Sequence, residues 1–462
     1  MTRPSPANPR IPPRQARDAV AQRLADRCRC FPDLPLEPMD VGGLDDREQA
    51  LARAIDHAVT RHWLTLVAVV QSRLSRPWEE LEPDLQAILL TGAAQLLTMD
   101  RLPDHAVVNH AVEWTRRHGQ ARAAGLVNAV LRAVVRLRAG HETPAAGAAI
   151  GEVDESAQRS TFPLSDGRLA QLHEPVFARE PVRRLAQRTS HPEPLLHEWI
   201  NMFGVDQATR LAWHDVTQPP LLLRRDGDPS AASETPPGTR PHREPGCLIY
   251  TGPHGGLSRL LEAHPNLSVQ DPASAIPVTL TGGLRPALIV DLCAGLGTKT
   301  RQLARLHPEA RIVCSDADPA RLDALRSTFR GSDRVAVLAP GDLLRFAGQC
   351  DLVVLDVPCS NTGVLPRRLE ARYRFNAERL AELVSLQRGI IADGLRLRAP
   401  GGSILYATCS LEPAENERQA AWIEQWHPLK RANERFTLPQ GLPGADPAEY
   451  RDGGYAALLG PV

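Results

Sequence analysis

The chain has 462 residues, enough for two or three domains with apolar cores. Its 54 basic and 54 acidic side chains balance, so the overall charge indicates no nucleic-acid or membrane partner, and any basic surface must be local. The eight cysteines include no CxxC pair, and no apolar run is long enough for an export signal or a membrane span. We therefore expect a cytoplasmic, monomeric protein with reduced thiols and no metal site.

Residues 14–142 are predicted to form an all-helical domain. Apolar residues recur every three or four positions in "DLQAILLTGAAQLL" and "GLVNAVLRAVVRLR", the period of an amphipathic helix. The periodicity stops in 143–165, which we interpret as a linker. A small α+β segment is expected at 166–284, with a Pro/Gly/Ser-rich insertion at 228–246 that we interpret as a surface loop.

Residues 285–462 alternate predicted strands and helices, which indicates a parallel sheet. The strands are expected in "ALIVDL", "ARIVCSD", "RVAVLA", "DLVVLD" and "SILYAT", with helices beginning near Lys299 and Pro319. The predicted fold class is thus α/β, a doubly wound Rossmann-like domain preceded by helices. Such domains bind their ligands at the carboxyl ends of the strands.

Three of these strand ends suit an adenosine ligand. The first strand leads into "DLCAGLGTKT", where Gly295 and Gly297 permit a tight turn and close approach of a ligand to the backbone. Asp316 lies nineteen residues beyond Gly297, where a carboxylate can accept both hydroxyls of a ribose, and Asp342 could face an adenine edge. The glycines could otherwise serve only the turn, and Asp316 could cap the next helix.

Two further strand ends each offer a thiol. Asp356 and Cys359 follow the fourth strand, and Cys409 follows the fifth. Because both cysteines lie beside small polar residues at a ligand-binding sheet edge, they favour catalysis over packing. Cys314 and Cys350, inside or beside strands, are instead expected to be buried as small hydrophobic residues. From the pattern alone, either Cys359 or Cys409 could be the attacking group.

Together, "DLCAGLGTKT", "LDVPCSNTGV" and "YATCSLEPAENE" resemble the motifs of the S-adenosylmethionine-dependent RNA cytosine-5 methyltransferases of the RsmB/NOP family. Further matches are "LSVQDPASAIPV", Gln387 and the closing "DGGYAALL". In the first domain, "RLPDHAVVNHAVEW" and "GLVNAVLR" are similar to the NusB-like RNA-binding domain. A NusB-like domain fused to this catalytic domain is the layout of bacterial 16S rRNA methyltransferases. The resemblance therefore implies S-adenosyl-L-methionine as cofactor, RNA as substrate, most simply 16S rRNA, and an RNA-binding role for the middle segment.

The resemblance also implies a role for each site residue. Cytosine C5 is a poor nucleophile, so a thiolate must first add at C6 and move electron density onto C5. By the resemblance, Cys409 is this nucleophile and Cys359 assists breakdown of the adduct. Asp356 would hydrogen-bond N3 and the exocyclic amine of a cytosine that has left its stack. The implied cofactor-binding residues are Cys293, Ala294, Gly295, Leu296, Gly297, Thr298, Lys299, Asp316, Asp342 and Asp356.

The cofactor loop departs from the family pattern Ala-Ala-Pro-Gly-Gly-Lys at three positions. Gly295 stands for the second alanine, Leu296 for the proline and Thr298 for the second glycine. Two alternatives stay open. One is a tRNA cytosine-5 methyltransferase that uses the helical domain on a different RNA. The other is a non-catalytic RNA-binding or ribosome assembly protein whose altered loop no longer binds S-adenosylmethionine.

Two groups of arginines are candidates for contacts with RNA phosphates. The group after the Cys359 loop is expected to grip the flipped strand, whereas the group on the helical domain could also be a solvated helix face. The first consists of Arg367, Arg368, Arg372 and Arg374, and the second of Arg116, Arg117, Arg122, Arg132, Arg136 and Arg138.

Overall fold

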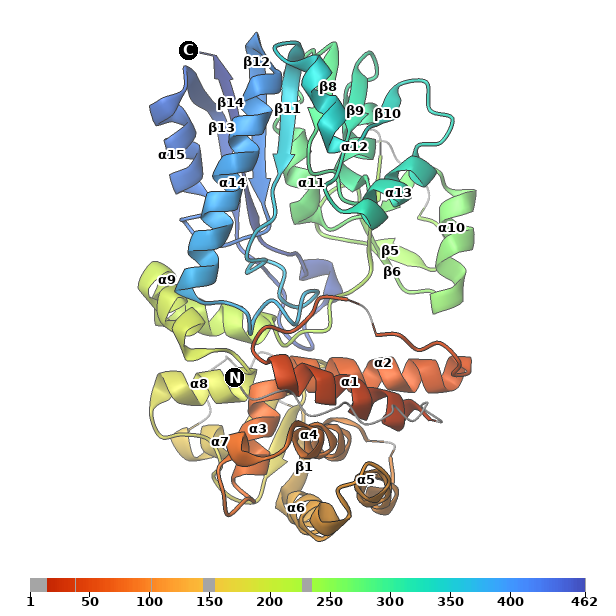
Figure 1. Ribbon diagram of the computed structural model, residues 1–462, viewed down its shortest axis with the longest axis vertical. Helices are drawn as coiled ribbons and strands as arrows, with labels where there is room; N and C mark the ends of the chain where they lie inside the picture. Colours follow the sequence, from red (N-terminus) through yellow and green to blue (C-terminus); the bar gives the residue numbers. More distant parts are fainter. Residues whose placement is uncertain (1–14, 38, 101, 144–153, 227–234, 462) are drawn as a thin grey trace. The chain divides into compact units, whose positions relative to one another are not determined.

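The computed structural model describes residues 15–37, 39–100, 102–143, 154–226 and 235–461. The chain forms two units, Met1–Val216 and Thr217–Val462, which are treated separately below (Figure 1). Residues 144–153 of the predicted linker and 227–234 near the predicted insertion lie outside the described residues. Among the residues described, no helix combines the length and the apolar character that crossing a membrane requires.

The first unit is built around one buried helix. Helix α4 is apolar on almost every side, begins with a proline in its first turn and is contacted by the other long helices of this region. A Cβ atom on Gly92 of α4 would lie 2.8 Å from Leu131, so the glycine permits the close approach of α6. The helices are α1 (Ala16–Cys30), α2 (Asp46–Arg61), α3 (Trp63–Gln71), α4 (Pro83–Thr98), α5 (Asp104–Arg117) and α6 (Ala124–Leu137).

A three-stranded antiparallel sheet follows in the same unit, in the order β1-β3-β2. Helix α7 and strand β2 lie within the stretch interpreted as a linker, where no regular structure was predicted. The elements are β1 (Arg138–Glu142), α7 (Glu155–Ser160), β2 (Thr161–Pro163), β3 (Leu169–Leu172), α8 (Pro181–Thr189) and α9 (Glu193–His214).

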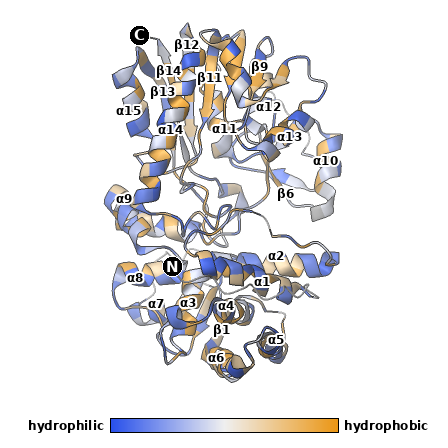
Figure 2. Cartoon of the chain, viewed as in Figure 1, coloured by the Kyte–Doolittle hydropathy of each residue, from blue (hydrophilic) through white to orange (hydrophobic). Residues whose placement is uncertain are grey.

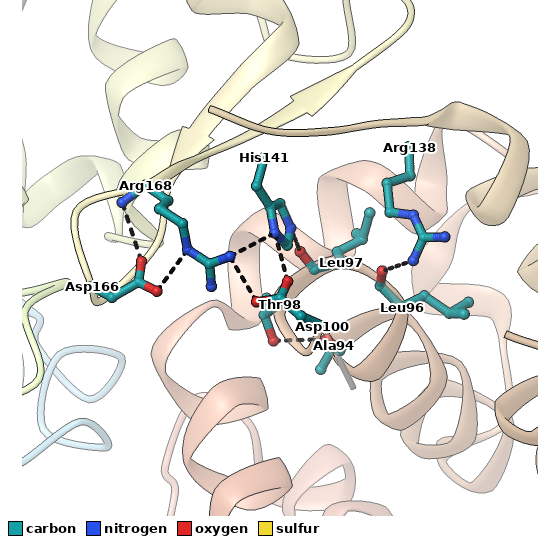
Figure 3. A network of polar contacts seen from close by, with 9 residues as sticks. All are labelled: Ala94, Leu96, Leu97, Thr98, Asp100, Arg138, His141, Asp166 and Arg168. Atoms are coloured by element: carbon teal, nitrogen blue, oxygen red, sulfur yellow. Dashed lines mark hydrogen bonds and ion pairs between the residues drawn. The ribbon is translucent and has the colours of Figure 1, made fainter. Parts of the chain in front are cut away.

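Polar side chains of β1 connect this sheet to the end of α4 (Figure 3). His141 contacts the Leu97 carbonyl through Nε2 at 2.9 Å and Asp100 through Nδ1 at 2.7 Å. Arg138 donates to the Leu96 carbonyl at 2.8 Å. The last carbonyl groups of a helix receive no hydrogen bond from an amide within the helix. These side chains satisfy them instead.

The second unit contains a seven-stranded sheet in the order β10-β9-β8-β11-β12-β14-β13. The first five are parallel, and β14 and β13 are antiparallel to their neighbours. All five predicted strands are present, and the predicted Rossmann-like α/β fold is confirmed. The strands are β8 (Leu288–Asp291), β9 (Arg311–Cys314), β10 (Val335–Val337), β11 (Cys350–Asp356), β12 (Arg398–Thr408), β13 (Leu429–Thr437) and β14 (Gly454–Pro461).

Helices cover both faces of this sheet. On one face Val353 and Leu355 pack with Ile391 of α14, and on the other Leu352 and Val354 belong to the same cluster as residues of α11, α12 and α13. Figure 2 shows the hydrophobic character of β11 and the mixed character of α14. Cys314 and Cys350 are fully buried, as predicted. The helices are α11 (Pro272–Thr279), α12 (Thr298–Leu306), α13 (Pro319–Thr328), α14 (Ala377–Leu397) and α15 (Glu417–Trp426).

A smaller antiparallel sheet in the second unit has the order β5-β6-β4-β7. Its buried Leu222 and Ile249 pack against Ala448 and Tyr450, in the segment between β13 and β14. Strand β5 lies inside the stretch that was interpreted as a surface loop. The elements are β4 (Leu222–Arg225), β5 (Thr239–Pro241), β6 (Cys247–Tyr250), α10 (Leu257–Ala263) and β7 (Leu267–Val269).

Candidate active site

The loop between β8 and α12 lies where the strand order of the sheet reverses, the usual ligand position in such folds. Gly295 and Gly297 have φ angles of 59° and 84°, a left-handed conformation that favours glycine. A Cβ atom on Gly297 would lie 2.6 Å from the Phe329 ring. The loop is held through its backbone, because the Ala294 N–H donates to the Ser315 carbonyl at 2.9 Å.

Asp316 joins the end of β9 to this loop. Its Oδ2 accepts a hydrogen bond from the Gly295 N–H at 2.9 Å, and its Oδ1 accepts one from the Asp318 N–H at 3.0 Å. The alternative role of Asp316 as a helix cap is wrong, because Asp318 caps α13. A carboxylate oxygen accepts more than one hydrogen bond, so Asp316 can still receive ribose hydroxyls. Asp342 is exposed in the short helix η4 (Pro340–Phe346) that follows β10.

Asp291, which the sequence reasoning missed, is completely buried at the end of β8. Its Oδ2 accepts a hydrogen bond from the Thr300 hydroxyl at 2.7 Å, and burial raises the pKa of its carboxyl group to about 7. Within the described part of the chain, its Oδ1 has no hydrogen-bond partner. A buried acceptor beside the glycine loop suits an ammonium donor, such as the amino group of the methionine moiety of S-adenosylmethionine.

The two candidate thiols meet at the ends of adjacent strands. Strands β11 and β12 are parallel neighbours, and their register pairs Asp356 with Ala407. The loops that follow bring the Sγ atoms of Cys359 and Cys409 within 3.2 Å. The contact with Cys409 and burial together raise the pKa of the Cys359 thiol well above its usual value. Cys359 is buried, whereas Cys409 is partly exposed.

Asn361, a second residue that the sequence reasoning missed, contacts both cysteines. Its Nδ2 donates to the Cys359 carbonyl at 2.8 Å, and its Oδ1 lies 3.4 Å from the Cys409 Sγ. Its φ angle is 62°, a conformation that asparagine tolerates better than most residues with side chains. The available signal was the Asn-Thr-Gly run that begins one residue after the Pro-Cys pair.

Lys299 and Asp356 form an ion pair that links the cofactor loop to the thiol loops. The Lys299 Nζ lies 2.7 Å from the Asp356 Oδ2. Burial is the largest single effect and disfavours the charged form of Lys299, but the charge and the hydrogen bond of Asp356, together with other nearby acidic groups, raise the pKa of the lysine. The charge of Cys409 acts on Lys299 in the same direction. The structure therefore brings together Lys299, Asp356, Cys359 and Cys409 at one sheet edge.

Only some of the arginines after the Cys359 loop that were predicted to contact RNA are placed to do so. The prediction is wrong for Arg372, which is 0% exposed. Arg367 is committed to two carboxylates, because its Nε lies 2.8 Å from Asp452 and its Nη2 lies 3.3 Å from Asp271. These ion pairs instead fix the Cys359 loop to neighbouring segments of the unit. Arg368 is exposed and Arg374 is half-buried, so both stay candidates for contact with RNA.

The arginines of the helical unit also divide into two sets. Arg117 pairs with Asp18 at 2.9 Å, and Arg138 pairs with Asp104 at 2.8 Å, so both have structural roles. The others project from α5, α6 and the turn between them, and are exposed: Arg116, Arg122, Arg132 and Arg136.

The parallel sheet with a reversed strand order, the glycine-containing loop and the acidic strand ends are those of a Rossmann-like, S-adenosylmethionine-dependent methyltransferase. A family model described as "16S rRNA methyltransferase RsmB/F" matches residues 284–442, and one described as "NusB family" matches residues 30–136. The chain belongs to the RsmB/F family of S-adenosylmethionine-dependent RNA methyltransferases, with a NusB-like region before the catalytic domain.

Curated relatives support the same assignment. A protein of Xanthomonas campestris named "Ribosomal RNA small subunit methyltransferase B" is 31% identical over 397 residues, 82% of this chain and 80% of the relative. A protein of the same name from Vibrio cholerae is 29% identical over 425 residues, 89% of each chain. The crystal structure of PH0851 has a TM-score of 0.66 at 19% identity and covers 98% of this chain and 99% of that chain, which supports the fold.

Proposed function

We propose that this protein forms 5-methylcytosine in 16S rRNA through a covalent adduct between Cys409 and C6 of the target cytosine. The observation that carries the proposal is the 3.2 Å separation of the Cys359 and Cys409 thiols, beside the ion pair of Lys299 with Asp356. The names of the Xanthomonas and Vibrio relatives support the small ribosomal subunit as the source of the RNA.

The two thiols have different roles in the proposed reaction. The Cys409 thiolate adds at C6, and the ring electrons move to C5, which becomes nucleophilic. Bound S-adenosylmethionine supplies an electrophilic methyl group on a sulfonium. After methylation, water takes the C5 proton, the electrons of that C–H bond restore the C5–C6 double bond, and the Cys409 sulfur leaves C6. The contact with Cys409 and burial raise the pKa of Cys359 and disfavour its thiolate, so we assign the attack to Cys409. The neutral Cys359 thiol, 3.2 Å from the Cys409 sulfur, can give that sulfur a proton as it leaves, so we assign Cys359 to the breakdown of the adduct.

The ion pair positions and polarises the base. Asp356 lies at the end of β11 with its carboxylate partly exposed, where it can accept a hydrogen bond from the exocyclic amine of cytosine. The Lys299 ammonium beside it adds positive charge close to the ring during attack. Both groups are held in place before the base arrives, so little reorganisation is needed in the transition state.

A denaturing gel with labelled RNA tests the roles of the thiols. Cys409→Ala should form neither product nor adduct, because no other group activates C5. Cys359→Ala should accumulate a protein–RNA species that survives denaturation, and the double variant should not. Cys30→Ala, at an exposed cysteine of α1, is the control and should behave as wild type. A stable adduct from Cys409→Ala with none from Cys359→Ala would exchange the two assignments.

Bisulfite sequencing of total RNA from a deletion strain identifies the substrate. Loss of one 5-methylcytosine in 16S rRNA is the expected result. Loss of a modified position in tRNA would favour the tRNA enzyme. An unchanged methylation pattern, together with no binding of S-adenosylmethionine in calorimetry, would favour the non-catalytic RNA-binding protein.

The helical unit is proposed to bind RNA phosphates through its exposed arginines. Replacing the four by glutamine should weaken binding to a structured rRNA fragment and reduce the dependence of affinity on salt, because fewer counterions are released. The affinity for S-adenosylmethionine should not change. An unaltered salt dependence would mean that these side chains form only a solvated surface. The residues are Arg116, Arg122, Arg132 and Arg136.

A further inference from the structure

Two adjacent polar residues, Glu415 and Asn416, lie directly before α15 in the loop that follows Cys409. Both are 0% exposed, although the proposed reaction assigns them no role. Burying a carboxylate and an amide is costly unless their hydrogen bonds are made within the protein. The partners of these two side chains therefore show what they do.

Glu415 holds the loop that carries Cys359. Its carboxylate accepts hydrogen bonds from the Ser360 N–H at 3.0 Å and from the Ser360 hydroxyl at 2.5 Å. The Gln387 side chain of α14 donates to Glu415 at 2.9 Å and to the Pro358 carbonyl at 2.9 Å. The residues on both sides of Cys359 are thus fixed, one by Glu415 directly and the other through Gln387.

Asn416 holds the loop that carries Cys409 in the same manner. Its Oδ1 accepts a hydrogen bond from the Thr408 hydroxyl at 2.5 Å, and its Nδ2 donates to the Ser410 carbonyl at 2.9 Å. Thr408 and Ser410 are the two neighbours of Cys409 in the chain. The amide therefore spans the nucleophile and fixes the backbone on both sides of it.

We propose that Glu415 and Asn416 are a pair of positioning residues that sets the distance between the two thiols. Consecutive Cα atoms are separated by a fixed length of about 3.8 Å. Because one residue of the pair holds each loop, neither loop can shift without straining the other. The Ser360 and Ser410 hydroxyls, 3.0 Å apart, join the loops a second time.

The charge of Glu415 also affects the protonation of Cys359. It disfavours a thiolate at Cys359, adding to the effects of the Cys409 contact and of burial on the pKa of that thiol. A neutral Cys359 beside a reactive Cys409 is the state that the proposed reaction requires.

The inference rests on the proposed function only in taking Cys359 and Cys409 as the reacting thiols, and its test needs neither RNA nor S-adenosylmethionine. Diamide oxidises two neighbouring thiols to a disulfide: the thiols lose two electrons and two protons, which the reagent takes up. The full-length protein is treated with diamide, and mass spectrometry after peptide digestion follows the Cys359–Cys409 disulfide with time. The variants are Glu415→Ala, Asn416→Ala and the conservative Glu415→Gln.

Glu415→Ala and Asn416→Ala should slow formation of the disulfide by about tenfold, because the thiols no longer rest in contact. Loss of the Glu415 charge alone would favour the Cys359 thiolate and speed the oxidation, so slower oxidation reports geometry. Glu415→Gln removes the charge but keeps the shape and most hydrogen bonds, so it should oxidise at least as fast as wild type. Glu417→Ala, two residues beyond Glu415 in the first turn of α15, removes the same charge outside both loops and is the matched control.

Unfolding temperatures of all variants are measured alongside. If Glu415→Ala does not fold, Ser360→Ala removes the hydroxyl bond to the same carboxylate and should slow the oxidation in its place. Wild-type oxidation rates in both Glu415→Ala and Asn416→Ala would overturn the inference, even if the enzyme methylates cytosine. Slowed oxidation in a protein that makes no 5-methylcytosine would leave the inference standing and reject the proposed function.

Discussion

The thiol loops and the cofactor loop lie at the same edge of the sheet but are held in different ways. The thiol loops depend on buried side chains, above all Glu415 and Asn416. The cofactor loop is held mainly through its backbone and Asp316, and its Leu296 side chain is 66% exposed. A loop held by its backbone tolerates changes of side chain. The departures from the family pattern described above lie in the cofactor loop, whereas both cysteine motifs are intact.

Lys299 spans the two regions, so its replacement should have the largest effect on activity. Lys299→Met leaves the Asp356 carboxylate without its ammonium partner and should lower kcat by about 10²–10³, or roughly 3–4 kcal/mol of transition-state stabilisation. Lys430→Met is the matched control, because Lys430 is the other lysine of the chain and lies exposed on β13. A methyl-transfer assay that shows equal loss in both variants would remove Lys299 from the site.

The buried carboxyl group of Asp291 should make the stability of the region around the cofactor loop depend on pH. Its pKa is about 7 in the folded protein, above the ordinary value of 3.8, so its contribution to stability is present at low pH and is lost as the pH rises toward 7. Between low pH and pH 7, the free energy of unfolding should fall by roughly 2–4 kcal/mol less in Asp291→Asn than in wild type. Unfolding temperatures measured from pH 4 to 8, with Asp342→Asn at an exposed aspartate as control, test the effect. Parallel curves for wild type and Asp291→Asn would contradict it.

The sequence was a good guide to the parts of the fold that depend on local pattern. The strands that end at Asp291 and Asp356 are continuous apolar runs, and their ends located the cofactor loop and the thiols. Strand β13 was missed because it is a polar strand at the edge of the sheet with an exposed central stretch. Glu415 and Asn416 read as ordinary loop residues, because their burial depends on contacts with residues up to 55 positions away.

Asp316→Ala should weaken the binding of S-adenosylmethionine by roughly 1.5–3 kcal/mol, because the carboxylate makes charge-assisted hydrogen bonds. We expect part of this loss from the proposed contacts with the ribose hydroxyls and part from the Gly295 N–H, which Asp316 holds. Calorimetry measures the affinity. Asp318→Ala, which removes only the cap of α13, is the control and should leave the affinity nearly unchanged. An equal affinity of Asp316→Ala and wild type would remove Asp316 from the cofactor site.

The smallest effect is expected for Leu296→Pro, which restores the residue usual in the family. The turn around Leu296 is closed by the hydrogen bond from the Gly297 N–H to the Ala294 carbonyl at 2.8 Å, in which Leu296 itself takes no part. Its exposed side chain can be exchanged without leaving a cavity, so the affinity for S-adenosylmethionine should change by less than about 0.5 kcal/mol.

Gly295→Ala in the same turn provides the contrast. Its φ angle of 59° is unfavourable for a residue with a Cβ atom, and the strain should cost about 1–2 kcal/mol of stability. If Leu296→Pro weakened cofactor binding more than Gly295→Ala, the loop would depend on the Leu296 side chain. The cofactor loop would then resemble the thiol loops, and the contrast between the two regions would fail.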